Sequence, residues 1–130
     1  MKKRLLESAF AAALALAAGC ASVTVCDQVG GVKVEAGLTP IETVEVSNMC
    51  WSFLCCLPIA SGDIGNPNGH TCDWFTDTAK VENQLKMLQA EADRVGAKRA
   101  VNVTTLTTDE DFFLFLFLRN KIHTSAVLVK

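Results

Sequence analysis

Beyond the positive start at Lys2, Lys3 and Arg4, clustered basic residues are missing from this sequence, and so are familiar catalytic signatures. Its 12 lysines and arginines are scattered among 14 acidic residues, for a formal net charge of −2. A chain without a basic patch is a poor nucleic-acid binder, because phosphate recognition depends on concentrated positive charge. There is also no Gly-x-Ser-x-Gly elbow, no His-Glu-x-x-His, no phosphate-binding glycine loop and no Cys-x-x-Cys pair. We therefore expect no nucleic-acid partner, no cofactor and no enzymatic activity.

The chain also lacks an apolar run long enough to span a bilayer. The small apolar segment Ala9–Ala18 is much shorter than the roughly 20 residues that a spanning helix needs. A positive start, Met1–Arg4, precedes it, and Leu16–Cys20 closes it. This order is typical of a secretory signal. We predict that residues 1–19 are a signal peptide.

The end of this signal resembles the lipobox of bacterial lipoproteins, in which small residues precede a cysteine. Ala18 and Gly19 supply the small residues, although Ala17 stands where the family prefers leucine. The resemblance implies cleavage after Gly19 and attachment of acyl chains to Cys20. Several chains hold a protein firmly, since each buried methylene contributes about 0.8 kcal/mol and one chain alone binds only marginally. An ordinary secretory signal with a chance cysteine is the alternative.

The same resemblance predicts where the mature protein resides. Ala21, rather than aspartate, follows the cysteine, which favours the periplasmic side of the outer membrane over the inner membrane. Residues 20–31 are small and polar, and we expect them to form a lipidated tether. Residues 32–130 are long enough for a single domain.

Five cysteines remain once Cys20 is lipidated. In an exported protein such residues usually form disulfides, and an odd number leaves at least one thiol outside them. The sequence leaves the connectivity open. The candidates for disulfide pairing are Cys26, Cys50, Cys55, Cys56 and Cys72.

A soft-metal or redox-sensing site is the alternative use of these cysteines, because thiolate and imidazole suit Zn²⁺ or Cu⁺. Its ligands would come from Cys50, Cys55, Cys56, His70 and Cys72. The spacing lacks the two close pairs of a zinc knuckle. Adjacent Cys55 and Cys56 would also point to opposite faces of a strand. We therefore expect no metal, and keep this site as the alternative.

The first half of the domain carries strand patterns. Residues 32–36 and 43–47 alternate apolar and polar side chains, which predicts a hairpin. Residues 49–59 are almost continuously apolar, so they form either a buried strand or an exposed apolar flap near the bilayer. Residues 60–73 are rich in glycine, asparagine and proline, which predicts a loop.

A helix is predicted over about residues 78–95. Its amino end can be capped by Asp77 or Thr78, and Gly96 supplies the left-handed residue that ends helices. One apolar stripe, at spacings of three and four residues, should pack against a sheet. It consists of Val81, Leu85, Leu88, Ala92 and Val95.

The remaining residues predict a three-stranded antiparallel meander. The β-rich segment 100–107 is followed by a polar loop over 107–111. Residues 112–118 are apolar at every position, which predicts a central strand covered on both faces. A turn at 119–121 then leads to a last strand over 122–129. The fold class is α+β, a mostly antiparallel sheet packed by one amphipathic helix.

The junction from Val95 to Val103, where a helix ends in Gly-Ala and a strand of Ala, Asn and Val follows, resembles a class of small bacterial proteins. The class includes an outer-membrane stress-sensing lipoprotein and a family named for heavy-metal binding. The resemblance covers residues 79–130 and implies a β-α-β-β core without transferring a function. We expect a small membrane-anchored envelope lipoprotein with a non-enzymatic binding or structural role, whose envelope partner is unidentified.

Overall fold

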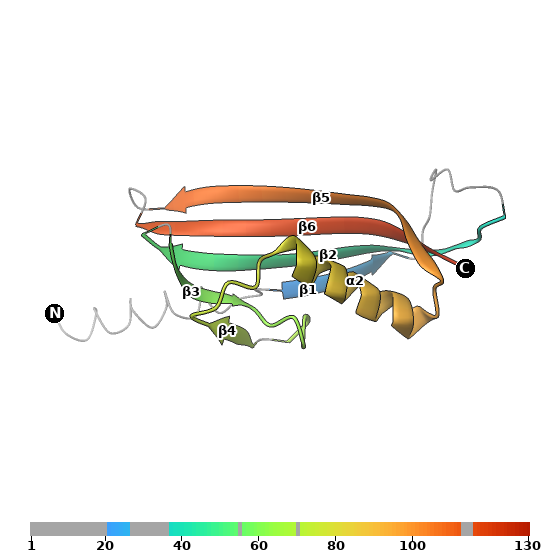
Figure 1. The fold of residues 1–130 in the computed structure, drawn as a ribbon, viewed down its shortest axis with the longest axis horizontal. Coiled ribbons are helices and arrows are strands. Elements are labelled where there is room, and N and C mark those ends of the chain that lie inside the picture. The colour runs from blue at the N-terminus through green and yellow to red at the C-terminus, as the bar shows by residue number, and fades with distance from the viewer. Residues whose placement is uncertain (1–20, 27–36, 55, 70, 113–115) are drawn as a thin grey trace.

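The computed structural model describes residues 21–26, 37–54, 56–69, 71–112 and 116–130, which form six strands and one helix (Figure 1). In chain order these elements are β1 (Ala21–Cys26), β2 (Pro40–Phe53), β3 (Leu57–Gly62), β4 (Cys72–Trp74), α2 (Val81–Val95), β5 (Arg99–Phe112) and β6 (Phe117–Val129). Strands hold 59% of the described residues. The expected antiparallel sheet with a helix is confirmed, but the fold is mostly β rather than a balanced α+β.

All the described strands belong to one antiparallel sheet. Their order is β4-β3-β2-β6-β5, and β1 pairs with β2 outside this path. Strand β6 pairs along the whole length of β2, so β1 and β3 share the other edge of β2. Along that edge, β1 pairs with residues 43–48 of β2, and β3 pairs with residues 50–53 of β2. The result is a long, narrow sheet with two distinct ends (Figure 1).

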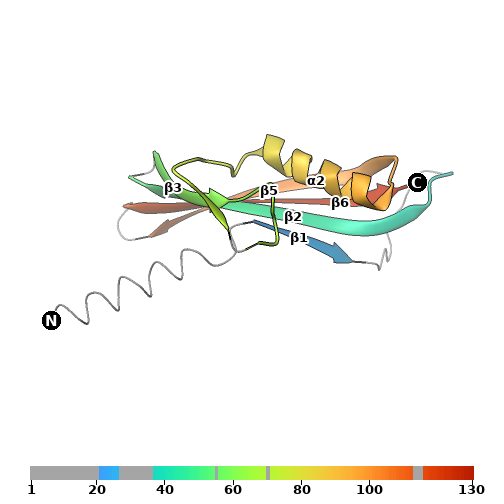
Figure 2. The same cartoon turned by 90° about the horizontal axis from the view of Figure 1, so that it is seen from below.

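Helix α2 covers one face of the sheet (Figure 2). The alternation in β2 selects that face: Val44 and Val46 are fully buried, while Glu45 between them is exposed. Leu128 of β6 is also fully buried, and Met87 of the helix packs into the same cluster. The core is therefore a single layer of side chains between the helix and the centre of the sheet.

The carboxyl end of the predicted helix is confirmed, and its start is three residues later than predicted. Gly96 has a φ of 69° and ends the helix in the left-handed conformation. We predicted that the helix would run over residues 78–95, but it begins at Val81. Neither Asp77 nor Thr78 caps it, because the chain is still extended before Val81.

The predicted apolar stripe of the helix was wrong in part. Leu88 and the residues near the carboxyl end face the core, but Val81 and Leu85 are 47% and 48% exposed. Gln84 and Met87 are buried in their place. The helix is thus rotated about its axis relative to the prediction, with a polar side chain on its inner face.

A polar hub explains this rotation; it consists of Asn48, Gly62, Thr78 and Gln84. The side-chain nitrogen of Gln84 donates to the backbone carbonyl of Val46 at 3.0 Å. The side-chain oxygen of Gln84 accepts from the backbone N–H of Asn48 at 3.1 Å. The Asn48 side chain donates to the Thr78 carbonyl (2.9 Å) and accepts from the Gly62 amide (3.1 Å). Buried polar groups need such partners. The hub therefore draws Gln84 inward and ties the segment before α2 to β2 and β3.

The predicted C-terminal meander was wrong in the positions of its strands. Residues 112–118 were expected to form a central strand, but Phe112 ends β5 and Phe117 begins β6. The predicted loop 107–111 lies within β5, and the predicted turn 119–121 lies within β6. Strand β6 pairs with β5 at one edge and with β2 at the other, which satisfies its backbone groups on both sides. The last strand over 122–129 is confirmed as part of β6.

The segment after Cys20 also differs from the prediction. We expected residues 20–31 to form a tether, but residues 21–26 form β1, which the alternation of Ser, Val and Thr there favours. Residues 43–47 pair with β1 and β6. Their predicted partner in a hairpin, residues 32–36, lies outside the described residues. Residues 21–26 therefore belong to the sheet, although the prediction placed them in the tether before the domain.

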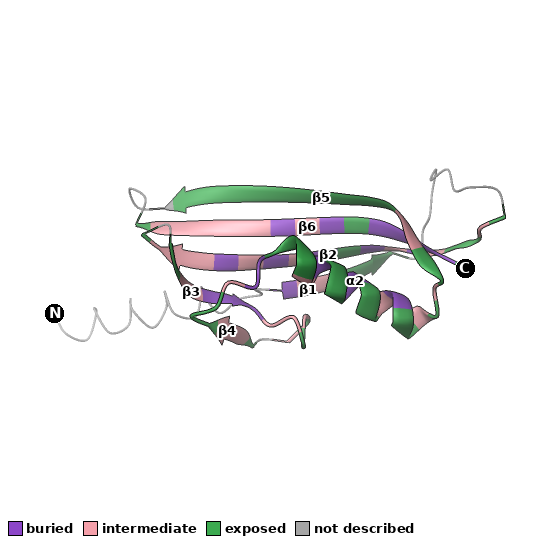
Figure 3. Ribbon diagram, in the orientation of Figure 1, coloured by how far each residue is buried: buried purple, intermediate pink, exposed green. Residues whose placement is uncertain are grey.

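The open edge of the sheet is formed by β5. Its residues from Asn102 to Asp111 are all exposed, as the green strand in Figure 3 shows. An exposed edge invites pairing with other chains, and charged side chains reduce this risk. Asp109, Glu110 and Asp111 provide that protection at the end of the strand.

Candidate functional site

The four cysteines that the structure describes lie on different parts of the sheet. Cys50 is a buried thiol on the face covered by α2, and Cys56 is an exposed thiol in the turn between β2 and β3. Cys26 ends β1 and Cys72 begins β4. Within the ranges that the structure describes, no group of three or more histidine, cysteine or acidic side chains is placed to hold a metal ion.

Two of the proposed metal ligands, Cys55 and His70, lie outside the described residues, so the alternative metal site stays a prediction. Disulfide pairing among the cysteines is likewise untested. The geometric argument against joint ligation by Cys55 and Cys56 assumed that both residues lie in a strand, and this was wrong for Cys56. Cys56 lies in a turn, where successive side chains need not point to opposite faces.

Burial raises the pKa of the Cys50 thiol to about 11, and the nearby carboxylate of Asp77 acts in the same direction. At pH 8 this lowers the thiolate fraction about a hundredfold relative to a thiol of pKa 9. We expect iodoacetamide at pH 8 to modify exposed Cys56 much faster than Cys50, because Cys50 is both buried and mostly protonated. Peptide mass spectrometry over a time course measures both rates in one sample, and equal rates would contradict the burial of Cys50.

The uncovered face of the sheet carries a histidine–carboxylate pair. His123 of β6 lies 3.1 Å from Glu45 of β2 through Nδ1, and both side chains reach solvent. They line a shallow depression of about 430 Å³ together with Thr104, Leu106 and Ser125. Among the residues that the structure describes, no serine or cysteine is hydrogen-bonded to His123 and so placed to act as a nucleophile. The arrangement resembles a cross-strand polar pair more than a catalytic centre.

The acidic side chains around β4 organise loops. Asp63 accepts hydrogen bonds from the Gly65 amide at 2.8 Å and the Thr71 hydroxyl at 2.9 Å. The Thr71 bond, followed by the Gly65 bond, lowers the pKa of the Asp63 carboxyl below its usual range. Asp77 accepts from the Ala79 amide at 3.0 Å. These contacts are those of turn residues, and they do not form an acid–base pair.

Exposed apolar side chains gather at one end of the sheet. We call this group the apolar end; it comprises Leu54, Leu57, Trp74, Phe75 and Leu116. The group comes from the β2–β3 turn, the end of β4 and the start of β6. Phe75 is 79% exposed and Leu57 is 57% exposed, so these side chains contribute little to the core. A grouping of this kind marks an interaction surface, whereas isolated exposed apolar residues do not.

The two turns at this end are held together. The Leu54 amide donates to the Leu116 carbonyl at 2.8 Å, joining the β2–β3 turn to the start of β6. Behind them the rings of Phe53 and Phe117 are packed, with centroids 5.5 Å apart. The Phe75 amide donates to the Ile59 carbonyl at 3.0 Å. Backbone hydrogen bonds therefore fix the segments that carry the apolar end.

Charged side chains border the apolar end. The guanidinium of Arg119 lies 5.5 Å from the ring centroid of Trp51, which is a cation–π distance. The same guanidinium forms an ion pair with Glu110 on β5. Acidic Asp109 and Asp111 flank Glu110 on this edge strand. The border thus combines the Arg119–Glu110 ion pair with the carboxylates of Asp109 and Asp111.

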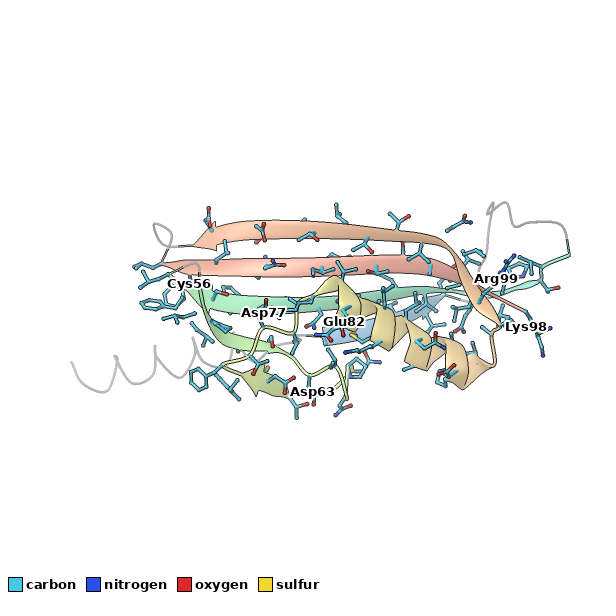
Figure 4. All side chains as sticks on the ribbon, viewed as in Figure 1. Cys56, Asp63, Asp77, Glu82, Lys98 and Arg99 are labelled. Atoms are coloured by element: carbon cyan, nitrogen blue, oxygen red, sulfur yellow. The ribbon has the colours of Figure 1, made fainter. Side chains whose placement is uncertain are left out.

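The opposite end of the sheet is polar. Figure 4 shows Lys98 and Arg99 at that end, with Cys56 at the apolar end of the same sheet. Lys98, Arg99 and the terminal Lys130 are all exposed there. The molecule therefore has a polarity along its strand direction, apolar at one end and basic at the other.

The sequence singled out only part of this surface. Trp51, Phe53 and Leu54 belong to the apolar segment 49–59, which the structure divides between β2, a turn and β3. Trp74 and Phe75 were missed, because two aromatic residues after a loop carry no periodic signal. Their exposure depends on the pairing of β4 with β3 at the sheet edge.

No known protein-family model, curated protein or solved structure matches this chain. None of the helices in the described part of the chain is long and apolar enough to cross a membrane. The resemblances noted at the signal and at the helix–strand junction therefore remain predictions.

Proposed function

We propose that this chain is a small lipoprotein of the bacterial cell envelope, anchored to a membrane through acyl chains on Cys20. Its domain would have a non-enzymatic role in binding another envelope component or in envelope structure. The outer membrane, on its periplasmic side, is the favoured location because Ala21 follows the cysteine. The lipobox-like end of the signal is the observation that carries the proposal.

The start of the fold is consistent with this proposal. Strand β1 begins at Ala21, the residue bonded to Cys20, and pairs directly with β2. An acylated Cys20 would therefore hold the sheet close to the bilayer surface, without an intervening linker. A domain held in this way can act on the membrane surface or on proteins next to it.

Intact mass of the membrane-extracted protein tests the anchor. We expect a mass equal to residues 20–130 plus acyl groups, and Cys20→Ser should yield the uncut chain without acyl groups. Cys26→Ser is the matched control, since it removes a cysteine six residues later and should keep the acylated mass. Wild-type protein that carries no acyl group, or a Cys20→Ser variant cut at the same bond, would contradict the proposal.

A further inference from the structure

We propose that the apolar end is a membrane-contact site that lies on the bilayer beside the lipid anchor. The inference rests on the proposed anchoring at Cys20 and specifies what the domain does there. Its occupant is the surface of a lipid bilayer of low net charge. Leu54, Leu57, Trp74, Phe75 and Leu116 make the contact.

The position of the anchor relative to this end supports the inference. Figure 1 shows β1 beginning near the middle of the sheet and running away from the apolar end. Ala21 pairs with Asn48, and Phe53 lies five residues further along β2. At about 3.3 Å per residue, Ala21, the residue bonded to Cys20, lies about 17 Å along the strand direction from Phe53, which precedes Leu54 of the apolar end. The anchor and the apolar end can therefore touch one flat surface when the sheet lies tilted on it.

The edge of the sheet that carries the anchor also carries the aromatic part of the site. Strands β1 and β3 lie on the same side of β2, and β4 adds to β3 beyond them. Trp74 and Phe75 lie at the end of β4, and Leu57 lies at the start of β3. Tryptophan is favoured at the boundary between lipid headgroups and acyl chains, where one side of its ring is apolar and the other is wet.

The charged side chains that border the apolar end indicate which kind of lipid surface it would contact. Arg119 is already paired with Glu110, and Asp109 and Asp111 add negative charge beside it. The basic side chains Lys98 and Arg99 lie at the opposite end. Contact with lipid therefore depends on apolar burial rather than on attraction to anionic headgroups. Added salt should not weaken it, and anionic lipid should not strengthen it.

Quenching of tryptophan fluorescence by brominated lipid tests the site. Wild-type lipoprotein is placed in phosphatidylcholine vesicles whose acyl chains carry bromine, at low and at high salt. The chain has two tryptophans. The Trp51→Phe variant reports Trp74 alone, and Trp74→Phe reports Trp51 alone. We expect strong quenching and a blue shift for Trp74, unchanged by salt, and much weaker quenching for Trp51.

Leu57→Asp and Leu106→Asp form a matched pair for the same assay in the wild-type background. Leu57 is 57% exposed at the apolar end, and Leu106 is 60% exposed in the middle of the uncovered face. Because both are on the surface, neither substitution should unfold the protein. Leu57→Asp should reduce the quenching at least about twofold, since a carboxylate opposes entry into the bilayer. Leu106→Asp should leave it unchanged.

The outcomes separate the two proposals. An acylated protein whose Trp74 emits as in water and is not quenched would overturn the membrane contact while leaving the anchor intact. A Trp74 that is unquenched but blue-shifted, in a protein that sediments as a dimer, would assign the apolar end to a second copy and also overturn it. An intact mass without acyl groups would refute the anchor, and quenching in added vesicles would then still support contact by the apolar end.

Discussion

Replacement of Asn48 by alanine is expected to lower the free energy of unfolding by about 3 kcal/mol. The Asn48 side chain is 1% exposed and bonds both the Thr78 carbonyl and the Gly62 amide. Its removal leaves the Gly62 amide in a buried site without this acceptor, and it opens a small cavity. It also removes one of the hydrogen bonds that hold the segment before α2, which Thr78 keeps tied to Ser61 and Gly62. Urea unfolding followed by tryptophan fluorescence measures the change.

Asn66→Ala is the control for this experiment. Asn66 is exposed in the loop between β3 and β4, so its replacement should change the unfolding free energy by less than about 0.5 kcal/mol. Gln84→Ala should behave like Asn48→Ala, because Gln84 bonds the backbone of β2 at Val46 and Asn48. If Asn48→Ala were as mild as Asn66→Ala, the polar hub would not stabilise the fold.

Leu128→Ala is expected to cost about 3 kcal/mol of unfolding free energy, through lost apolar burial and a residual cavity. Leu128 is fully buried on β6, in the same cluster as Val44, Met87 and Leu88. Both the helix and the sheet contact this cluster, so neither layer can close the space alone. The loss should appear as a lower urea midpoint with an unchanged slope.

Leu106→Ala is the control, because it makes the same leucine-to-alanine change at an exposed position. Leu106 is 60% exposed on β5, and its truncation should change the unfolding free energy by less than about 0.5 kcal/mol. A similar loss for both leucines would mean that the uncovered face of the sheet is buried in solution. That result would point to a partner or a second copy on this face.

The prediction of the fold succeeded where a local signal agreed with tertiary packing. Gly96 ended the helix as expected, because its left-handed conformation depends mainly on the residue itself. The helix stripe was wrong at Val81 and Leu85, because the amide of Gln84 finds backbone partners on β2. A helical wheel weighs hydrophobicity alone and cannot anticipate those partners.

The candidate site also combines features visible in the local sequence with features that depend on tertiary contacts. The apolar character of residues 49–59 was visible in the sequence, and so was the possibility that they are exposed. Sequence reasoning could not join Leu54 to Leu116, which are 62 positions apart and meet through the pairing of β2 with β6. Nor could it place Trp74 at the same end of the sheet, since that depends on the pairing of β4 with β3.

The order of charge, apolar run and cysteine in the first 20 residues by itself determined the predicted address and anchor, because a signal is read as a linear pattern. Local alternation and composition likewise predicted parts of β2, β5 and β6, and Gly96 predicted the end of the helix. Only the tertiary structure decided the sheet order, the inward face of α2 and the grouping of exposed apolar residues at one end. These depend on long-range strand pairing and on which buried polar groups find partners, and neither is encoded in any short stretch of the chain.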